Sequence, residues 1–188
     1  MSDPGTASQS LPEPGTQAWL DSVIEDVIDP EAPIIDPHHH LWPEGGSRPY
    51  GLDELLADLS SGHRIVDTVF VECGAAYRSD GPVELRPVGE TEFVAVEAER
   101  APRQVMGGVV AHADLTDADR LDAVLDAHEE AAGGRLRGIR HAGSHALHPE
   151  VLTIPGRALR RCRLPSWCRA PRGAGPHLRH LALPLSES

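Results

Sequence analysis

Between residues 33 and 141 the sequence alternates short apolar segments with longer amphipathic ones, and this alternation constrains the fold more than any other feature. It predicts strands at 33–36, 68–73, 104–111 and 136–141. It predicts helices between them at 52–59, 90–100 and 117–132, the last capped by Asp114 or Thr116 and ended by Gly133-Gly134. Strands that alternate with helices form a parallel sheet with crossover helices. The sequence therefore predicts an α/β fold of about four βα units, which fits either half of a (β/α)8 barrel or an open doubly wound sheet.

The segment before the first predicted strand has two parts. Residues 1–16 are rich in Pro, Gly, Ser and Thr and are predicted to be disordered. Residues 17–28 are predicted to form an amphipathic helix that packs on the following domain and ends at Asp29-Pro30. The helical spacing is carried by Trp19, Leu20, Val23, Ile24, Val27 and Ile28.

Charge and composition exclude several classes of protein. The net charge of −12 argues against nucleic acid or an anionic membrane as the main partner, so a small-molecule substrate is expected. The N-terminus lacks the pattern of a secretory signal, and no apolar run approaches the roughly 18 residues that cross a bilayer. Cys73, Cys162 and Cys168 are too few and too irregularly spaced for a disulfide framework, and Cys73 is expected to be a small buried apolar residue. We therefore expect a cytoplasmic protein.

A histidine cluster follows the first predicted strand, in Asp36-Pro37-His38-His39-His40. Residues two apart on a strand project from the same face, so His38 and His40 can converge on one metal ion while His39 points away. Histidine nitrogens bind zinc at about 2.0–2.1 Å. Asp36 lies on the same side and could hold an imidazole in the right tautomer. The alternative is a polar loop that happens to contain histidines.

The segment Ile34-Ile35-Asp36-Pro37-His38-His39-His40-Leu41-Trp42 resembles the opening signature of the amidohydrolase-related branch of the amidohydrolase superfamily. These proteins are TIM-barrel metal-dependent hydrolases that include sugar lactonases and related decarboxylases. The helix at Trp19-Leu20 and the segments 68–73, 88–93 and 137–141 are also similar to the family, so the resemblance covers roughly residues 17–156.

The resemblance implies a partial TIM barrel with chemistry at the carboxyl ends of its strands. His38 and His40 would bind a divalent metal, most simply zinc, or contact a substrate carbonyl in members that dispense with metal. The implied activity is hydrolysis of a small cyclic ester or amide, lactonase-like, or decarboxylation. Trp42 would either cover the pocket or have a packing role.

Three further residues are candidates for catalytic roles. Arg140 ends the fourth predicted strand, so its guanidinium could meet a substrate carboxylate or lactone oxygen bidentately, or form a structural ion pair with Glu72 or a helix acid. Glu72 ends the second predicted strand, as either a site residue or a buried structural carboxylate. His141 follows Arg140 and is expected to line the site.

Other polar residues near strand ends are not assigned to catalysis. His112, His145 and His148 follow predicted strands, and the last two are expected to be loop histidines. Glu90 and Glu92 begin a predicted helix, where carboxylates interact favourably with the helix dipole.

Residues 157–188 differ in character from the rest of the chain. They hold seven Arg and a single acid, Glu187, and the strand–helix alternation stops. A zinc site from Cys162, Cys168, His177 and His180 has a spacing outside the common patterns, and an arginine-rich binding tail is a second interpretation.

A frame change is the third interpretation of this tail. One allowed set of GC-rich codons for residues 177–185, read one base further on, encodes Thr-Phe-Asp-Thr-Trp-Arg-Tyr-His. This is similar to a Phe-Asp-x-Trp-x-Tyr-His segment at the fifth barrel strand of the same family. A full barrel needs about 250 residues. We therefore expect a truncated, weakly active or inactive chain, with possible self-association through an exposed sheet edge.

Overall fold

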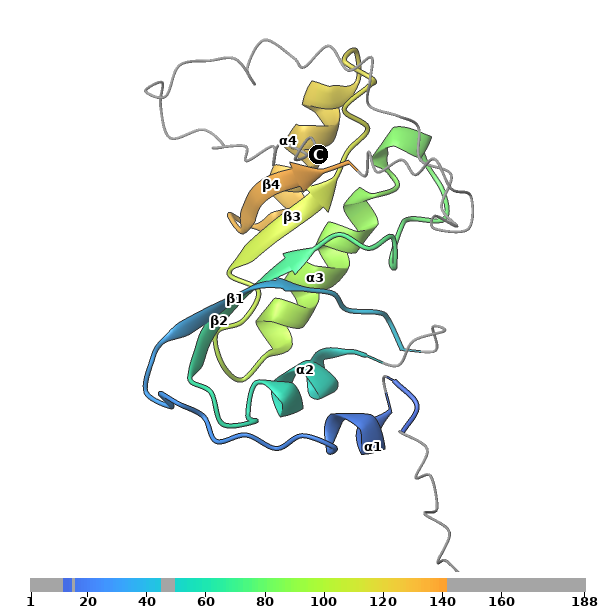
Figure 1. Ribbon diagram of the computed structural model, residues 1–188. Coiled ribbons are helices and arrows are strands. Elements are labelled where there is room, and N and C mark those ends of the chain that lie inside the picture. The colour runs from blue at the N-terminus through green and yellow to red at the C-terminus, as the bar shows by residue number, and fades with distance from the viewer. Residues whose placement is uncertain (1–11, 15, 45–49, 142–188) are drawn as a thin grey trace, which may run out of the picture.

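The computed structural model describes residues 12–14, 16–44 and 50–141, and they contain one sheet of parallel strands. Its order is β1-β2-β3-β4, with β1 at Ile34–His39, β2 at Ile65–Val71, β3 at Gly108–His112 and β4 at Leu136–Arg140. Every neighbouring pair is parallel, and all the carboxyl ends therefore lie along the same side of the sheet (Figure 1). The predicted α/β fold with a parallel sheet is confirmed. The sheet is open, so the barrel remains a proposal.

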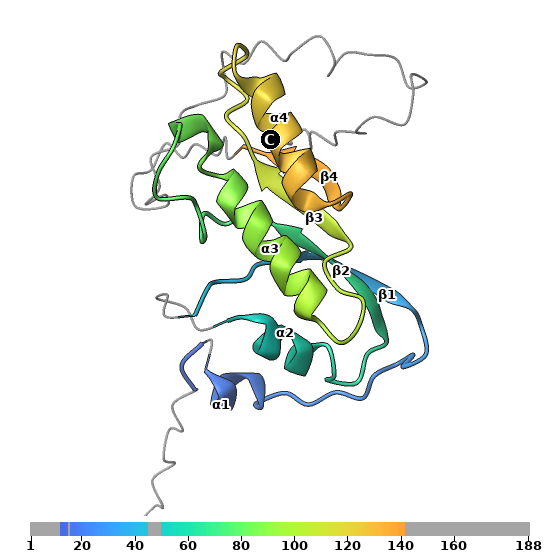
Figure 2. The same cartoon turned by 180° about the vertical axis from the view of Figure 1, so that it is seen from behind.

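The helices that connect the strands pack on the sheet. They are α2 at Leu52–Asp58, α3 at Val88–Arg100, preceded by a 3-10 turn at Val83–Leu85, and α4 at Leu121–Ala132. Figure 2 shows α3 and α4 side by side over one face of the sheet, and the two helices contact each other. None of the helices in the described ranges is long and apolar enough to cross a membrane.

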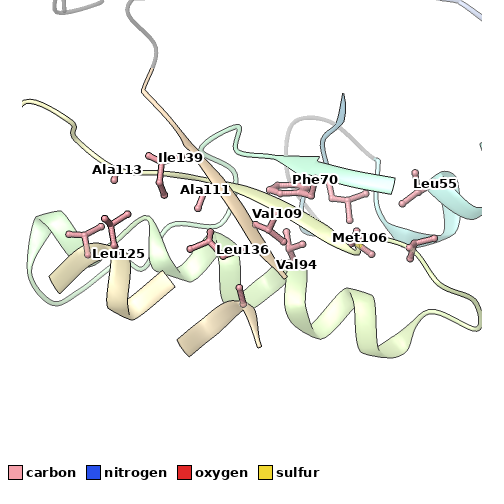
Figure 3. Close-up of a cluster of buried hydrophobic side chains, with 14 of the residues drawn as sticks. Leu55, Phe70, Val94, Met106, Val109, Ala111, Ala113, Leu125, Leu136 and Ile139 are labelled. Carbon is pink, nitrogen blue, oxygen red and sulfur yellow. The ribbon is translucent and has the colours of Figure 1, made fainter. Parts of the chain in front are cut away.

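The core lies between this face of the sheet and the helices (Figure 3). Phe70 and Val109 from the sheet meet Val94 of α3, and each is at most 1% exposed. Alternate residues of β2 and β3 point to this side, as expected for strands with one covered face. Apolar periodicity therefore predicts this layer correctly.

Several element boundaries differ from the prediction, and side-chain hydrogen bonds explain two of the differences. The third strand begins at Gly108 because residues 104–107 have no regular structure, with Met106 at φ 52°. Asp67 Oδ1 accepts the Gly107 N–H at 3.0 Å, and Thr68 Oγ1 accepts the Met106 N–H at 2.9 Å. These bonds hold residues 106 and 107 against β2.

The last helix begins at Leu121, not at 117. The Asp114 carboxylate accepts the Thr116 N–H at 2.9 Å and closes a separate turn, so neither Asp114 nor Thr116 caps the helix. The prediction of its cap was therefore wrong. Its end was correct, since Gly133 adopts the left-handed conformation with φ 56° and ψ 42°.

The predicted helix over 17–28 is wrong. Helix α1 covers only Gln17–Leu20, and the apolar side chains beyond it face solvent, with Ile24 89% and Ile28 101% exposed. Isolated helices shorter than about 12–15 residues are marginal in water without tertiary packing. Most of the apolar side chains of residues 21–28 have no surface to pack on, so their helical spacing does not produce a helix. The segment 1–16 lies mostly, and the tail 157–188 wholly, outside the described residues.

Candidate functional site

The candidate residues lie along the carboxyl ends of the strands. His38 and His40 are at the end of β1, and Glu72 directly follows β2. Arg140 ends β4, where it pairs in register with His112 of β3. Ligand sites of parallel α/β sheets form outside this edge of the sheet. These four residues therefore lie at the edge of the sheet where the sequence analysis expected them.

The structure brings the His38 and His40 rings together. Their Nε2 atoms are 3.3 Å apart, and the ring centroids are 4.9 Å apart at an interplanar angle of 88°. Two nitrogens that each bind one tetrahedral zinc ion at 2.0–2.1 Å are separated by about 3.3–3.4 Å. The imidazole pair therefore fits two corners of a tetrahedral metal site.

One of these rings has its tautomer fixed by the backbone. His40 Nδ1 lies 2.7 Å from the carbonyl oxygen of Val71. Because a carbonyl only accepts, Nδ1 carries the proton, and Nε2 keeps its lone pair for the site. The expected partner, Asp36, instead accepts the backbone N–H of His38 at 3.0 Å. The prediction that Asp36 orients an imidazole is therefore not met by its contacts, and Val71 takes that place.

The surroundings of His38 favour its neutral form. Burial lowers the pKa of His38, and the neighbouring His40 and Arg140 lower it further. A neutral imidazole is the form that binds a metal.

His39 points to the opposite side of β1, as predicted. It is 7% exposed, and its Nε2 lies 2.9 Å from Thr68 Oγ1. Burial lowers the pKa of His39 to about 4. Its Nδ1 is buried without a hydrogen-bond partner. This ring is therefore a packing residue of the strand and is turned away from the pair.

Arg140 and Glu72 form an ion pair beside the histidines. Arg140 Nε donates to Glu72 Oε1 at 2.6 Å, and Nη2 donates to the backbone carbonyl of Glu72. The Glu72 side chain is 10% exposed and that of Arg140 is 38% exposed. The structural ion pair considered from the sequence is thus present, and it leaves the outer part of the guanidinium accessible.

His141 and His112 meet at the ends of β4 and β3. Their ring centroids are 5.5 Å apart. His141 Nδ1 accepts the Leu115 N–H at 3.1 Å, which places the ring proton on Nε2. Asp114 Oδ1 lies 3.5 Å from the same Nδ1, but an accepting nitrogen cannot also donate to a carboxylate. Burial lowers the pKa of His141, so the neutral ring with a free Nε2–H is favoured.

Glu90 has a positional role that the sequence did not reveal. Its side chain is buried, and Oε1 accepts the Ala75 N–H at 2.8 Å and the Cys73 N–H at 3.1 Å. It therefore fastens the loop after β2 and does not merely face the dipole of its own helix. Beside it, Gly89 has no room for a Cβ, which would lie 2.7 Å from the carbonyl oxygen of Ala76.

Cys73 is half-buried and bonded, which is more polar than the expected apolar role. Its Sγ lies 3.5 Å from Glu90 Oε1. Burial and the charge of Glu90 raise the pKa of the Cys73 thiol to about 12. Such a thiol is a poor nucleophile at neutral pH.

His128 was also missed by sequence reasoning. It is completely buried between α4 and α3, with Nδ1 2.8 Å from Thr91 Oγ1 and Nε2 2.9 Å from the His112 carbonyl oxygen. Burial lowers its pKa to about 4. Its place on the apolar face of a helix was the available signal.

Trp42 lies next to the pair and lines a separate hollow. Its ring centroid is 5.8 Å from that of His40. A hollow of about 410 Å³ is lined by Trp42 together with Tyr50, Phe93 and several acids. His145 and His148 fall outside the described residues.

Within the described ranges, no group of three or more His, Cys, Asp or Glu side chains is arranged to hold a metal ion. The His38–His40 pair offers two imidazole nitrogens of the kind that zinc binds, one donor fewer than such a group requires. Comparisons with protein-family models, with curated proteins and with solved structures found no match.

Proposed function

We propose that this chain is an amidohydrolase-related, metal-dependent hydrolase of a small cyclic ester or amide, lactonase-like in its chemistry. The observation that carries the proposal is the separation of 3.3 Å between His38 Nε2 and His40 Nε2 at the carboxyl end of the first strand. The donor set suits zinc, because two neutral imidazoles are among its commonest ligands. When bound, such an ion would polarise the substrate carbonyl and make a water molecule more acidic.

The remaining candidates suit the handling of a polar substrate. Glu72 holds Arg140 through Nε, so the exposed side of the guanidinium can bind a substrate oxygen or carboxylate. The charge of Glu72 also offsets the charge of Arg140 before substrate arrives. We assign Arg140 to substrate binding and Glu72 to its positioning.

His141 is suited to donating a hydrogen bond. Its Nδ1 is occupied by the Leu115 N–H, which leaves Nε2–H as the free donor. A donor at the mouth of the site could stabilise charge that develops on a substrate oxygen.

Zinc titration of the full chain tests the metal pair. At a free zinc concentration about 100-fold above Kd, binding stabilises the folded state by about 2.7 kcal/mol. We expect zinc to raise the Tm of the wild-type protein and to have little effect on His38→Ala or His40→Ala. His63→Ala is the matched control, because His63 is an exposed histidine at the amino end of β2, opposite the carboxyl ends of the strands. Equal zinc stabilisation of all four proteins would refute the metal site.

A lactone assay separates an enzyme from a metal-binding protein without turnover. Because we expect this chain to be weakly active or inactive, we expect at most slow zinc-dependent hydrolysis of an aldonolactone, measured by the protons it releases. Any such activity should be lost in His40→Ala and Arg140→Met. Zinc-linked stabilisation without hydrolysis would instead favour the non-catalytic alternative. Release of carbon dioxide from a carboxylated substrate would identify the decarboxylase branch.

A further inference from the structure

Arg86 stands out because no carboxylate of the described residues forms an ion pair with its guanidinium. It precedes α3 and lines a hollow of about 500 Å³ between the start of α3 and the start of α4. Its Nε is buried without a hydrogen-bond partner, and no carboxylate among the described residues pairs with it. A buried donor left unsatisfied costs free energy, so this guanidinium has hydrogen-bonding capacity that no described residue uses.

The other charges of the hollow already have partners. Arg120 Nε lies 3.1 Å from Glu84 Oε1, and Arg120 Nη1 donates to Asp117 Oδ2 at 2.7 Å. Asp114 accepts the N–H and the hydroxyl of Thr116. Arg86 is therefore the cation of this lining that has no counter-ion among the described residues.

The balance of charge limits the ligand. The lining holds two arginines and three acids, Glu84, Asp114 and Asp117, which gives a formal net charge of −1. A ligand with two or more negative charges would be repelled by these acids, whereas a single negative charge can be met by Arg86. The lining therefore favours a monoanion over a phosphate.

The remaining walls are aromatic and apolar. The rings of Tyr77 and His112 lie 6.1 Å apart, centroid to centroid, at an angle of 32°. The apolar surface comes from Val83, Pro87, Leu121 and Val124. Burial raises the pKa of Tyr77, so its phenol stays neutral and keeps its O–H for donation. These walls suit a flat or apolar body with one polar end.

We propose that this hollow binds a small aromatic or apolar molecule with a single carboxylate. The carboxylate would accept hydrogen bonds from the terminal nitrogens of Arg86, Nη1 and Nη2, because Nε is buried out of reach of the hollow. Its body would lie against Tyr77, Val83 and Val124. The site uses none of the residues assigned to hydrolysis and needs no metal, so it stands apart from the proposed function.

Calorimetric titration of the full chain with benzoate, without added metal, tests this site. We expect millimolar binding that weakens at least tenfold in Arg86→Gln. Arg64→Gln is the matched control, because Arg64 is exposed and donates to the Glu31 carbonyl away from the hollow. Benzyl alcohol, which lacks the charge, and inorganic phosphate should each bind at least tenfold more weakly than benzoate.

Two further variants cover a failure of Arg86→Gln to fold. Arg86→Lys keeps the positive charge but loses the two parallel N–H donors of the guanidinium, so it should bind benzoate severalfold more weakly than the wild type does. Val83→Trp places bulk in the hollow from a side chain that is 70% exposed, and should reduce binding while circular dichroism stays unchanged. The proposal is overturned if wild type does not bind benzoate, if phosphate binds as tightly, or if the folded variants bind like wild type.

Discussion

The helix-covered face of the sheet and the rim at its carboxyl ends use their polar side chains in different ways. On the covered face, both ring nitrogens of His128 have partners, and the surrounding side chains are apolar. At the rim, the His38 and His40 rings face each other and the buried Nε of Arg86 has no partner. Among the described residues, the covered face leaves only His39 Nδ1 buried without a hydrogen-bond partner, whereas the rim presents the His38–His40 pair and the unpaired Arg86. That difference separates residues that hold the fold from residues that can meet a ligand.

The largest expected effect tests the covered face. Phe70→Ala should lower the free energy of unfolding by about 3–5 kcal/mol, because it removes a large side chain that is 1% exposed and leaves a cavity. Urea denaturation measures the loss. The matched rim variant, His38→Ala, should change the unfolding free energy by no more than about 0.5 kcal/mol without metal. Similar losses in the two variants would contradict the division between face and rim.

The next effect depends on pH and on His128. Its pKa is about 4 in the folded protein, below the value near 6.5 of an unfolded histidine, so the unfolded chain binds more protons between these pH values. The contribution is present above about pH 6.5 and is lost as the pH falls toward 4. Between about pH 7.5 and 5, His128 should cost the wild type about 2 kcal/mol of stability.

His128→Gln should therefore lose less stability on acidification than the wild type. The variant will keep a part of the pH dependence, because burial also lowers the pKa of His39 to about 4. His63→Gln is the control, since its ring is exposed, and it should follow the wild type. Parallel pH curves for wild type and His128→Gln would show that His128 does not act in this way.

The last prediction compares two carboxylates of the same helix, and the smaller expected effect is at Glu92. Glu90→Gln should cost about 1–3 kcal/mol, because two backbone N–H groups lose a charged acceptor. Glu92→Gln makes the same substitution two residues later, where Glu92 pairs with Arg78 at the surface, and should cost about 0.2–1 kcal/mol. Thermal unfolding of both variants checks the ranking. A reversed order would mean that the loop after β2 is not fastened by Glu90.

The sequence predicts the covered face better than the rim, and particular residues show why. Phe70 and Val109 follow strand alternation, which depends only on neighbours along the chain. The approach of His38 to His40 was likewise predictable, since it follows from a spacing of two on a strand. Contacts across the sequence were not predictable in detail: Val71, 31 residues away, fixes the His40 tautomer in place of Asp36.

The failures share a physical cause. Asp114 was expected to cap α4, but its carboxylate closes a local turn, a competing use of short polar side chains. The apolar spacing at 19–28 predicted a packed helix, yet spacing states nothing about whether a surface exists to receive it. Glu90 accepts hydrogen bonds from a loop 15–17 residues earlier, and no local pattern encodes such a reach.

The fastened loop after β2 joins two places that otherwise differ in chemistry. At one end Glu72 holds Arg140, and five residues later Tyr77 lines the hollow beside Arg86. Between them, the carboxylate of Glu90 anchors the chain, and Gly89 lets the helix start touch it. An insertion between Glu72 and Tyr77, or a substitution that loosens this loop, would disturb both the Arg140 ion pair and the hollow beside Arg86. A change that affects only one of these two sites would therefore have to lie outside residues 72–77.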